Sequence, residues 1–73
     1  MSGLAKRSVT LAGHRTSVAL EPEFWAVLEA EAARRGGSLA GLIAEIDAGR
    51  EDRALASALR VFALSAAQRA QRA

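Results

Sequence analysis

Pro22 is the only proline in this 73-residue chain, and it separates two kinds of hydrophobic periodicity. Before it, apolar and polar residues alternate over about 7–11 and again over 15–20, which is the period of a half-buried β-strand. After it, apolar residues recur every three or four positions, as in an amphipathic helix. Proline favours extended backbone at the preceding residue and is well tolerated at the first position of a helix. The sequence therefore predicts two strands followed by helices.

Glycine divides the helical part into segments. Gly36 follows the first apolar stripe, Ser38 is suited to cap a second helix, and Gly49 ends the second stripe. We expect helices over about 22–35, 38–48 and 53–68. With no internal repeat and no long linker, residues 1–73 are predicted to form a single domain.

The sequence offers no obvious disulfide or metal site that would stabilise a small domain. Cysteine is absent and His14 is the only histidine, so neither a disulfide nor the usual zinc frameworks are expected. A chain of this size buries only roughly 60% of its unfolded surface, and an isolated two-stranded ribbon leaves exposed edges. Strand pairing between two chains would solve both problems, so we expect a homodimer. Its predicted core contains Val18, Leu20, Leu28, Ile43 and Ile46.

Charge is distributed unevenly along the chain. Residues 1–20 carry a formal charge of +3 with no acid, residues 21–52 carry −5, and residues 53–73 carry +4. The N-terminal end is therefore expected to meet an anionic partner. Lys6 and Arg7 there either contact phosphates or form a solvated terminus. If the partner is DNA, the acidic residues must face away from it.

Nothing in the sequence predicts an enzyme. His14 has no nucleophile to activate, and neither a phosphate-binding loop nor a cluster of metal ligands is visible. We expect no cofactor and no metal. No apolar run is long enough for a membrane span or a leader segment, so a cytoplasmic protein without a membrane partner is predicted.

Two segments carry a resemblance to a known family. These are RTSVALEPEFW at residues 15–25 and RGGSLAGLIAEI at residues 35–46. Together they resemble the ribbon-helix-helix transcription factors of the Arc/MetJ-like superfold. The flanking stretches KRSVTLAGHRTS and LASALRVFAL resemble a bacterial stand-alone subfamily with an upstream basic strand and a third helix. The resemblance implies a mainly α chain with a short N-terminal β-ribbon, forming an intertwined homodimer with an additional C-terminal helix.

The same resemblance implies a site. In this family an intermolecular antiparallel ribbon enters the major groove of double-stranded DNA, and the bound protein regulates transcription. By position, the residues that contact bases would be Arg15, Ser17 and Ala19. Ala19 departs from the polar residue that is common there and limits contact to a thymine methyl. The backbone N–H groups near Ser38 and Leu39 would contact a phosphate.

The third helix leaves a second hypothesis open. Its apolar stripe consists of Leu55, Leu59, Phe62 and Ala66. We expect this stripe to pack on the dimer core. The alternative is a protein-interaction module of antitoxin type, in which the C-terminal helix holds a partner protein and Phe62 is exposed in the isolated chain.

Overall fold

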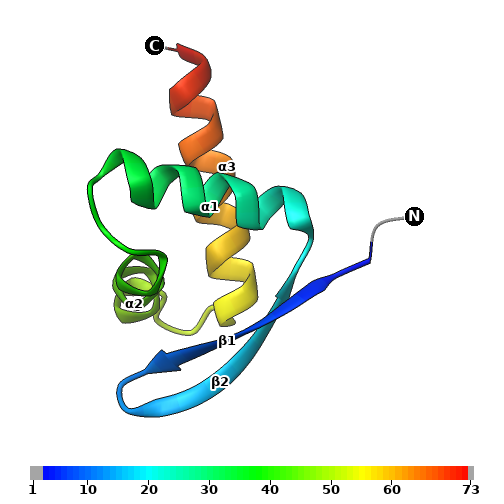
Figure 1. Ribbon diagram of the computed structural model, residues 1–73, viewed down its shortest axis with the longest axis vertical. Coiled ribbons are helices and arrows are strands. Elements are labelled where there is room, and N and C mark those ends of the chain that lie inside the picture. The colour runs from blue at the N-terminus through cyan, green and yellow to red at the C-terminus, as the bar shows by residue number, and fades with distance from the viewer. Residues whose placement is uncertain (1–2, 73) are drawn as a thin grey trace.

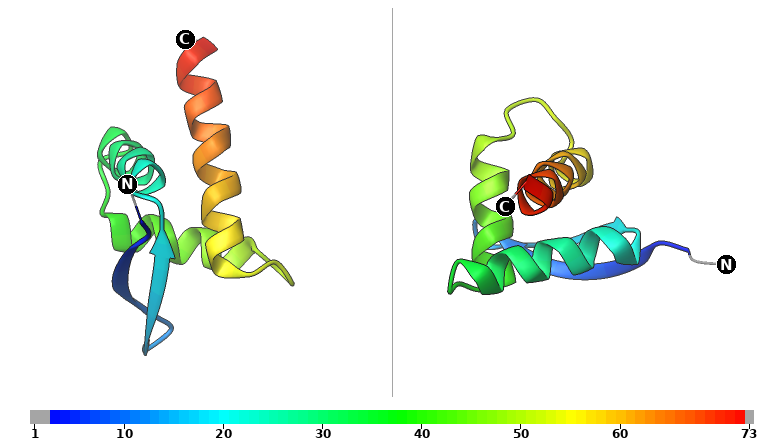
Figure 2. Two further views of the ribbon diagram at one scale, coloured as in Figure 1. Left: turned by 90° about the vertical axis from the view of Figure 1, so that its right-hand side faces the viewer. Right: turned by 90° about the horizontal axis from the view of Figure 1, so that it is seen from above.

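The computed structural model describes residues 3–72, in which a β-hairpin is followed by three helices (Figure 1). The elements are β1 (Ala5–Leu11), β2 (His14–Leu20), α1 (Pro22–Arg34), α2 (Leu39–Gly49) and α3 (Leu55–Arg72). This order confirms the predicted fold class of a short ribbon followed by helices. The helices gather on one face of the hairpin, and α1 crosses α3 (Figures 1 and 2). Within the described residues, no helix is both long and apolar enough to cross a membrane.

The two strands pair with each other inside one chain. They are antiparallel, with Ala5 opposite Leu20 and Leu11 opposite His14. The connection is the two-residue turn Ala12–Gly13, whose φ angles of 51° and 82° are both positive. Two positive φ values are the signature of the type I′ turn, which matches the twist of a hairpin. The ribbon observed is thus intramolecular, and a ribbon between two chains stays a prediction.

The boundary between ribbon and helices is built as the proline predicts. Glu21 is extended, with φ −61° and ψ 146°, and Pro22 opens α1 with Glu23 in its first turn. Gly36 follows α1 with a φ of 73°, a left-handed conformation that favours glycine. Ser38 caps α2, its Oγ accepting a 3.0 Å hydrogen bond from the backbone N–H of Gly41. These local signals place α1 and α2 where the sequence indicates.

Several predicted boundaries were wrong by one to four residues. The strands begin at Ala5 and His14, because cross-strand pairing runs the whole length of the hairpin, from Ala5 opposite Leu20 at the open end to Leu11 opposite His14 at the turn. The first helix begins at Pro22 as predicted and ends one residue early, and the second is shifted by one residue at both ends, which is within the usual uncertainty of helix termini. The third helix runs over 55–72 instead of 53–68. Its late start reflects a turn in which the Arg53 N–H donates to the Arg50 carbonyl, and its longer end is rich in alanine, with Arg69 and Arg72 in the last turn.

One hydrophobic core joins the hairpin to all three helices. Its buried members are Val18, Leu20, Trp25, Leu28, Ala32, Leu42, Ile43, Leu59 and Ala63. Four of the five residues predicted for a dimer core are therefore buried within a single chain, whereas Ile46 is half-buried. That these residues also form a core shared by two chains stays a prediction.

The predicted packing of the third helix is confirmed in part. Leu59 and Ala66 are buried, Leu59 completely, while Leu55 and Phe62 are half-buried. The side chain of Arg60 ties α3 to the start of α1, because its Nε donates a 3.0 Å hydrogen bond to Glu21. The third helix thus closes the core that the hairpin and α1 leave open.

Candidate nucleic-acid interface

The hairpin has two faces, and the one turned away from the helices is polar. Residues directly opposite each other in an antiparallel pair point to the same side. The register pairs Lys6 with Ala19, Ser8 with Ser17 and Thr10 with Arg15. We call these six residues the outer face. All are exposed except Ala19, which is half-buried.

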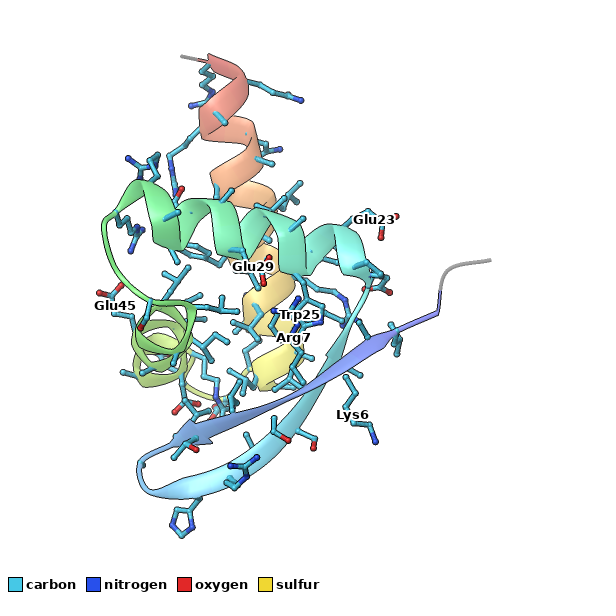
Figure 3. All side chains as sticks on the ribbon, viewed as in Figure 1. Lys6, Arg7, Glu23, Trp25, Glu29 and Glu45 are labelled. Carbon is cyan, nitrogen blue, oxygen red and sulfur yellow. The ribbon has the colours of Figure 1, made fainter. Side chains whose placement is uncertain are left out.

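The outer face brings together four of the seven residues predicted to contact DNA. The three predicted base contacts lie in a row on β2, namely Arg15, Ser17 and Ala19. Lys6, a predicted phosphate contact, lies beside Ala19 on β1. In Figure 3 its side chain points away from the helices.

Arg7, the other predicted phosphate contact on β1, lies on the opposite face. Its Nη1 forms a 2.6 Å ion pair with Glu29 of α1, and its guanidinium stands 4.7 Å from the centre of the Trp25 ring. Figure 3 shows Arg7 directed toward these two residues. Lys6 and Arg7, adjacent in the sequence, therefore project to opposite sides, as successive residues of a strand do.

Ser38 and Leu39 lie on another element, at the start of α2. The Ser38 Oγ accepts from Gly41 and its carbonyl accepts from Leu42, which makes it a structural cap. The Leu39 side chain packs against the core. At a helix start the first backbone N–H groups have no intrahelical acceptor, so those of Leu39 and its neighbour are the donors available to an anion.

The outer face carries positive charge without a compensating acid. Every acidic residue follows Leu20 in the sequence and lies on a helix or a connection. Among residues 3–72, neither Lys6 nor Arg15 has a carboxylate within ion-pairing distance, whereas Arg7, Arg34, Arg35, Arg50 and Arg60 do. These two cations therefore present their charge to the solvent.

The most buried acid is neutralised by arginines of the helical layer. Glu31 of α1 accepts hydrogen bonds from Arg34 at 2.6 Å and Arg35 at 2.9 Å, and Arg69 of α3 lies 3.9 Å away. The hydrogen bonds from Arg34 and then Arg35 lower the pKa of Glu31 to about 2. Glu21 likewise has a lowered pKa, because its own backbone N–H and then Arg60 donate to it. These carboxylates are charged at neutral pH and paired within the fold.

Sequence reasoning missed two members of the outer face, Ser8 and Thr10. Their place depends on the register of β1, which alternation alone does not determine. The signal that fixes it is the Ala12–Gly13 turn, because a two-residue hairpin loop sets which residues lie opposite. Through that turn Ser8 becomes the neighbour of Ser17, and Thr10 that of Arg15.

His14 and the acidic residues lie apart from the outer face. His14 is exposed at the start of β2, opposite Leu11. Within residues 3–72, no three side chains of the metal-ligating types come together. The outer face itself carries two cations and three hydroxyl groups, which are suited to binding through charge and hydrogen bonds.

Comparison with known families tests the resemblance directly. The family model described as the ribbon-helix-helix domain matches residues 4–67, from just before β1 to well inside α3. The chain belongs to the ribbon-helix-helix domain family. Ribbon-helix-helix domains are typically DNA-binding transcription regulators or antitoxins. Comparisons with curated proteins and with solved structures give no match.

Proposed function

We propose that this ribbon-helix-helix protein is a homodimeric, sequence-specific DNA-binding protein that regulates transcription. The observation that carries the proposal is the outer face, where Arg15 and Ser17 are exposed on the same side as Lys6 and no carboxylate of residues 3–72 pairs with either cation. A β-ribbon fits the major groove, and an arginine there donates two hydrogen bonds to guanine O6 and N7. Ser17 contacts base edges and Ala19 contacts a thymine methyl. The action is binding without a chemical step, in the cytoplasm of a bacterial cell.

The proposed homodimer uses the second edge of β2. Within the described residues the sheet has two strands, so β2 is paired to β1 along one edge only. An open strand edge offers unpaired N–H and C=O groups to another chain. A twofold pairing of β2 with β2 would place two copies of Arg15 and Ser17 on one continuous face. Dimerisation predicts a melting temperature that rises with protein concentration, whereas a monomer by sedimentation with concentration-independent melting would contradict it.

The DNA-binding proposal is tested with two variants that remove the same charge. Arg15→Ala removes a cation from the outer face, and Arg72→Ala removes one from the end of α3, far from the hairpin in Figure 1. A binding site would first be selected by the wild-type protein from random duplex DNA. We expect Arg15→Ala to weaken binding to that site by about 1 to 3 kcal/mol for each guanine that the arginine no longer binds. Arg72→Ala is expected to bind almost as wild type.

Three results would contradict this proposal. They are failure of the selection to enrich any sequence, equal loss of affinity in both variants, and unchanged affinity of Arg15→Ala for the selected site. Circular dichroism of each variant confirms that the fold is retained, which is expected because both side chains are exposed.

One observation favours the second function, capture of a partner protein by the C-terminal helix. Val61 and Leu64 of α3 are 46% and 56% exposed, although they are large apolar side chains. In this form of the hypothesis the partner contacts those two residues. Phe62 is half-buried, with the guanidinium groups of Arg35 and Arg69 at 5.3 and 5.9 Å from its ring centre. A double variant, Val61→Ser with Leu64→Ser, would abolish such capture and leave DNA binding intact.

A further inference from the structure

Strand β1 gives the outer face a second row of side chains, which the minimal one-strand ribbon does not have. The row consists of Lys6, Ser8 and Thr10, all exposed. It lies beside the row formed by Arg15, Ser17 and Ala19 on the antiparallel strand β2. Each residue of this β1 row lies directly opposite one of the β2 row, so any ligand that covers one row meets the other at its border.

The width of the sheet decides what the β1 row can reach. In the proposed dimer the strand order is β1, β2, then β2 and β1 of the second copy. Neighbouring strands are roughly 4.8 Å apart, so the outermost strands are about 14 Å apart. The major groove is only about 12 Å wide. The two central strands therefore fit into the groove, and the two outer strands lie above its walls, which are the phosphate backbones.

We propose that the β1 row binds the DNA phosphate backbones on both sides of the groove, while the β2 row contacts the bases. The assignment adds Ser8 and Thr10 to the interface and rests on the proposed homodimer. Lysine and hydroxyl side chains are among the usual donors to phosphate oxygens. The distribution of charge supports phosphate binding by this row. No carboxylate pairs with Lys6 within residues 3–72, and the acidic residues lie on the helices and their connections.

The inner face of the same hairpin provides the contrast. Arg7, adjacent to Lys6 in the sequence, is held by Glu29 and cannot reach a duplex on the outer side without breaking its 2.6 Å ion pair. Thr16 is exposed like Thr10, but it is paired with Val9 and so lies on the inner face. The hairpin thus contains two exposed threonines that differ in the face they occupy.

The test compares these threonines in the full-length protein. Binding of Thr10→Val, Thr16→Val, Lys6→Gln and Arg15→Ala would be measured by fluorescence anisotropy. The probes are the selected duplex and a duplex of scrambled sequence, each at several salt concentrations. Valine keeps the branched shape that strands favour while removing the hydroxyl, so the fold is retained.

Removal of a phosphate-binding side chain predicts a specific pattern. We expect Thr10→Val to weaken binding to both duplexes by the same factor, about two- to tenfold. Thr16→Val should bind as wild type. Lys6→Gln should weaken binding to both duplexes and lower the salt slope by about 2 for the dimer, one for each phosphate that its two lysines bind. Arg15→Ala should weaken binding to the selected duplex far more than to the scrambled one.

Two outcomes overturn the proposal while leaving the proposed function in place. If Thr10→Val and Lys6→Gln bind as Thr16→Val does while Arg15→Ala is impaired, the β1 row is only a solvated edge. If Thr10→Val loses affinity for the selected duplex alone, the β1 row contacts bases, as it would if a single hairpin entered the groove. If Arg15→Ala is also unimpaired on the selected duplex, the proposed function itself is refuted.

Discussion

The indole Nε1 of Trp25 donates a 2.8 Å hydrogen bond to the backbone carbonyl of Ala5, which joins the first turn of α1 to the first residue of β1. Trp25 is only 1% exposed, whereas Ala5 is half-buried, so this bond lies at the border of the core. It acts together with the ion pair between Arg7 and Glu29, two residues further along the strand. These two contacts hold β1 against α1, and they thereby direct the other face of the hairpin outward.

Replacing Trp25 by phenylalanine should weaken this attachment. The variant keeps an aromatic ring, but it leaves the Ala5 carbonyl without its donor and opens space in the core. We expect Trp25→Phe to lower the free energy of unfolding by about 1 to 3 kcal/mol, measured by urea denaturation. Arg7→Gln removes an ion pair whose side chains are 41% and 52% exposed, so it should cost less than about 1 kcal/mol. A larger loss from Arg7→Gln than from Trp25→Phe would contradict this ranking.

Substitutions at the two adjacent residues of the hairpin turn should change the free energy of unfolding in opposite directions. Ala12 has a φ of 51°, which costs a residue with a Cβ roughly 1 kcal/mol, and Gly13 has a φ of 82°. Asparagine tolerates this conformation and precedes glycine in the most favourable type I′ turns. Ala12→Asn should therefore raise the free energy of unfolding by about 0.5 to 1 kcal/mol, and Gly13→Ala should lower it by about 1 kcal/mol. Urea denaturation of both variants measures the two changes, and changes of the same sign would show that the turn is not of type I′.

Local signals allowed most of the fold to be predicted from the sequence. Pro22, Gly36 and Ser38 each impose a backbone conformation or supply a cap, so the order of elements, both ends of α1 and the start of α2 follow from single residues to within one position. The β2 row also follows, because alternation identifies the polar side of the strand.

What could not be predicted depends on contacts between elements. Alanine is an uncommon first residue of a type I′ turn, so the signal for the hairpin register was weak, and with it the places of Ser8 and Thr10. The inward direction of Arg7 follows from that same register. The pairs of Glu31 with Arg34 and Arg35 are local, three and four residues apart on one helix, but the burial of Glu31 and its 3.9 Å approach to Arg69 depend on how α1 crosses α3.

Glu31 predicts how stability depends on pH. Hydrogen bonds from Arg34 and then Arg35 lower its pKa from 4.5 to about 2. A carboxylate whose pKa is lowered by folding stabilises the folded chain above pH 4.5, and this stabilisation is lost as the pH falls toward 2. Glu31→Gln should therefore be less stable than wild type at pH 7, and the difference should shrink between pH 4.5 and 2. Urea denaturation at pH 7, 4, 3 and 2 measures it.

A neighbouring acid serves as the control for Glu31. Glu45 also pairs with Arg35, at 3.0 Å, but its side chain is 71% exposed. Glu45→Gln is expected to change the free energy of unfolding by less than about 0.5 kcal/mol at pH 7. A difference between wild type and Glu31→Gln that stays constant from pH 7 to 2 would show that the arginines do not act through the charge of Glu31.

The third helix provides the last prediction, because two large residues of its apolar stripe, Leu59 and Phe62, differ in burial. Leu59 is completely buried, so Leu59→Ala should cost about 2 to 5 kcal/mol. Phe62 is half-buried beneath Arg35 and Arg69, so Phe62→Ala should cost less than the roughly 3 to 5 kcal/mol of a fully buried ring. The exposed Leu64, replaced by serine, should change stability by less than about 0.5 kcal/mol. Thermal melting of the three variants without any ligand should rank them in this order. If Leu59→Ala melted at the wild-type temperature, α3 would not be part of the core, and a role for this helix in holding a partner protein would gain the advantage.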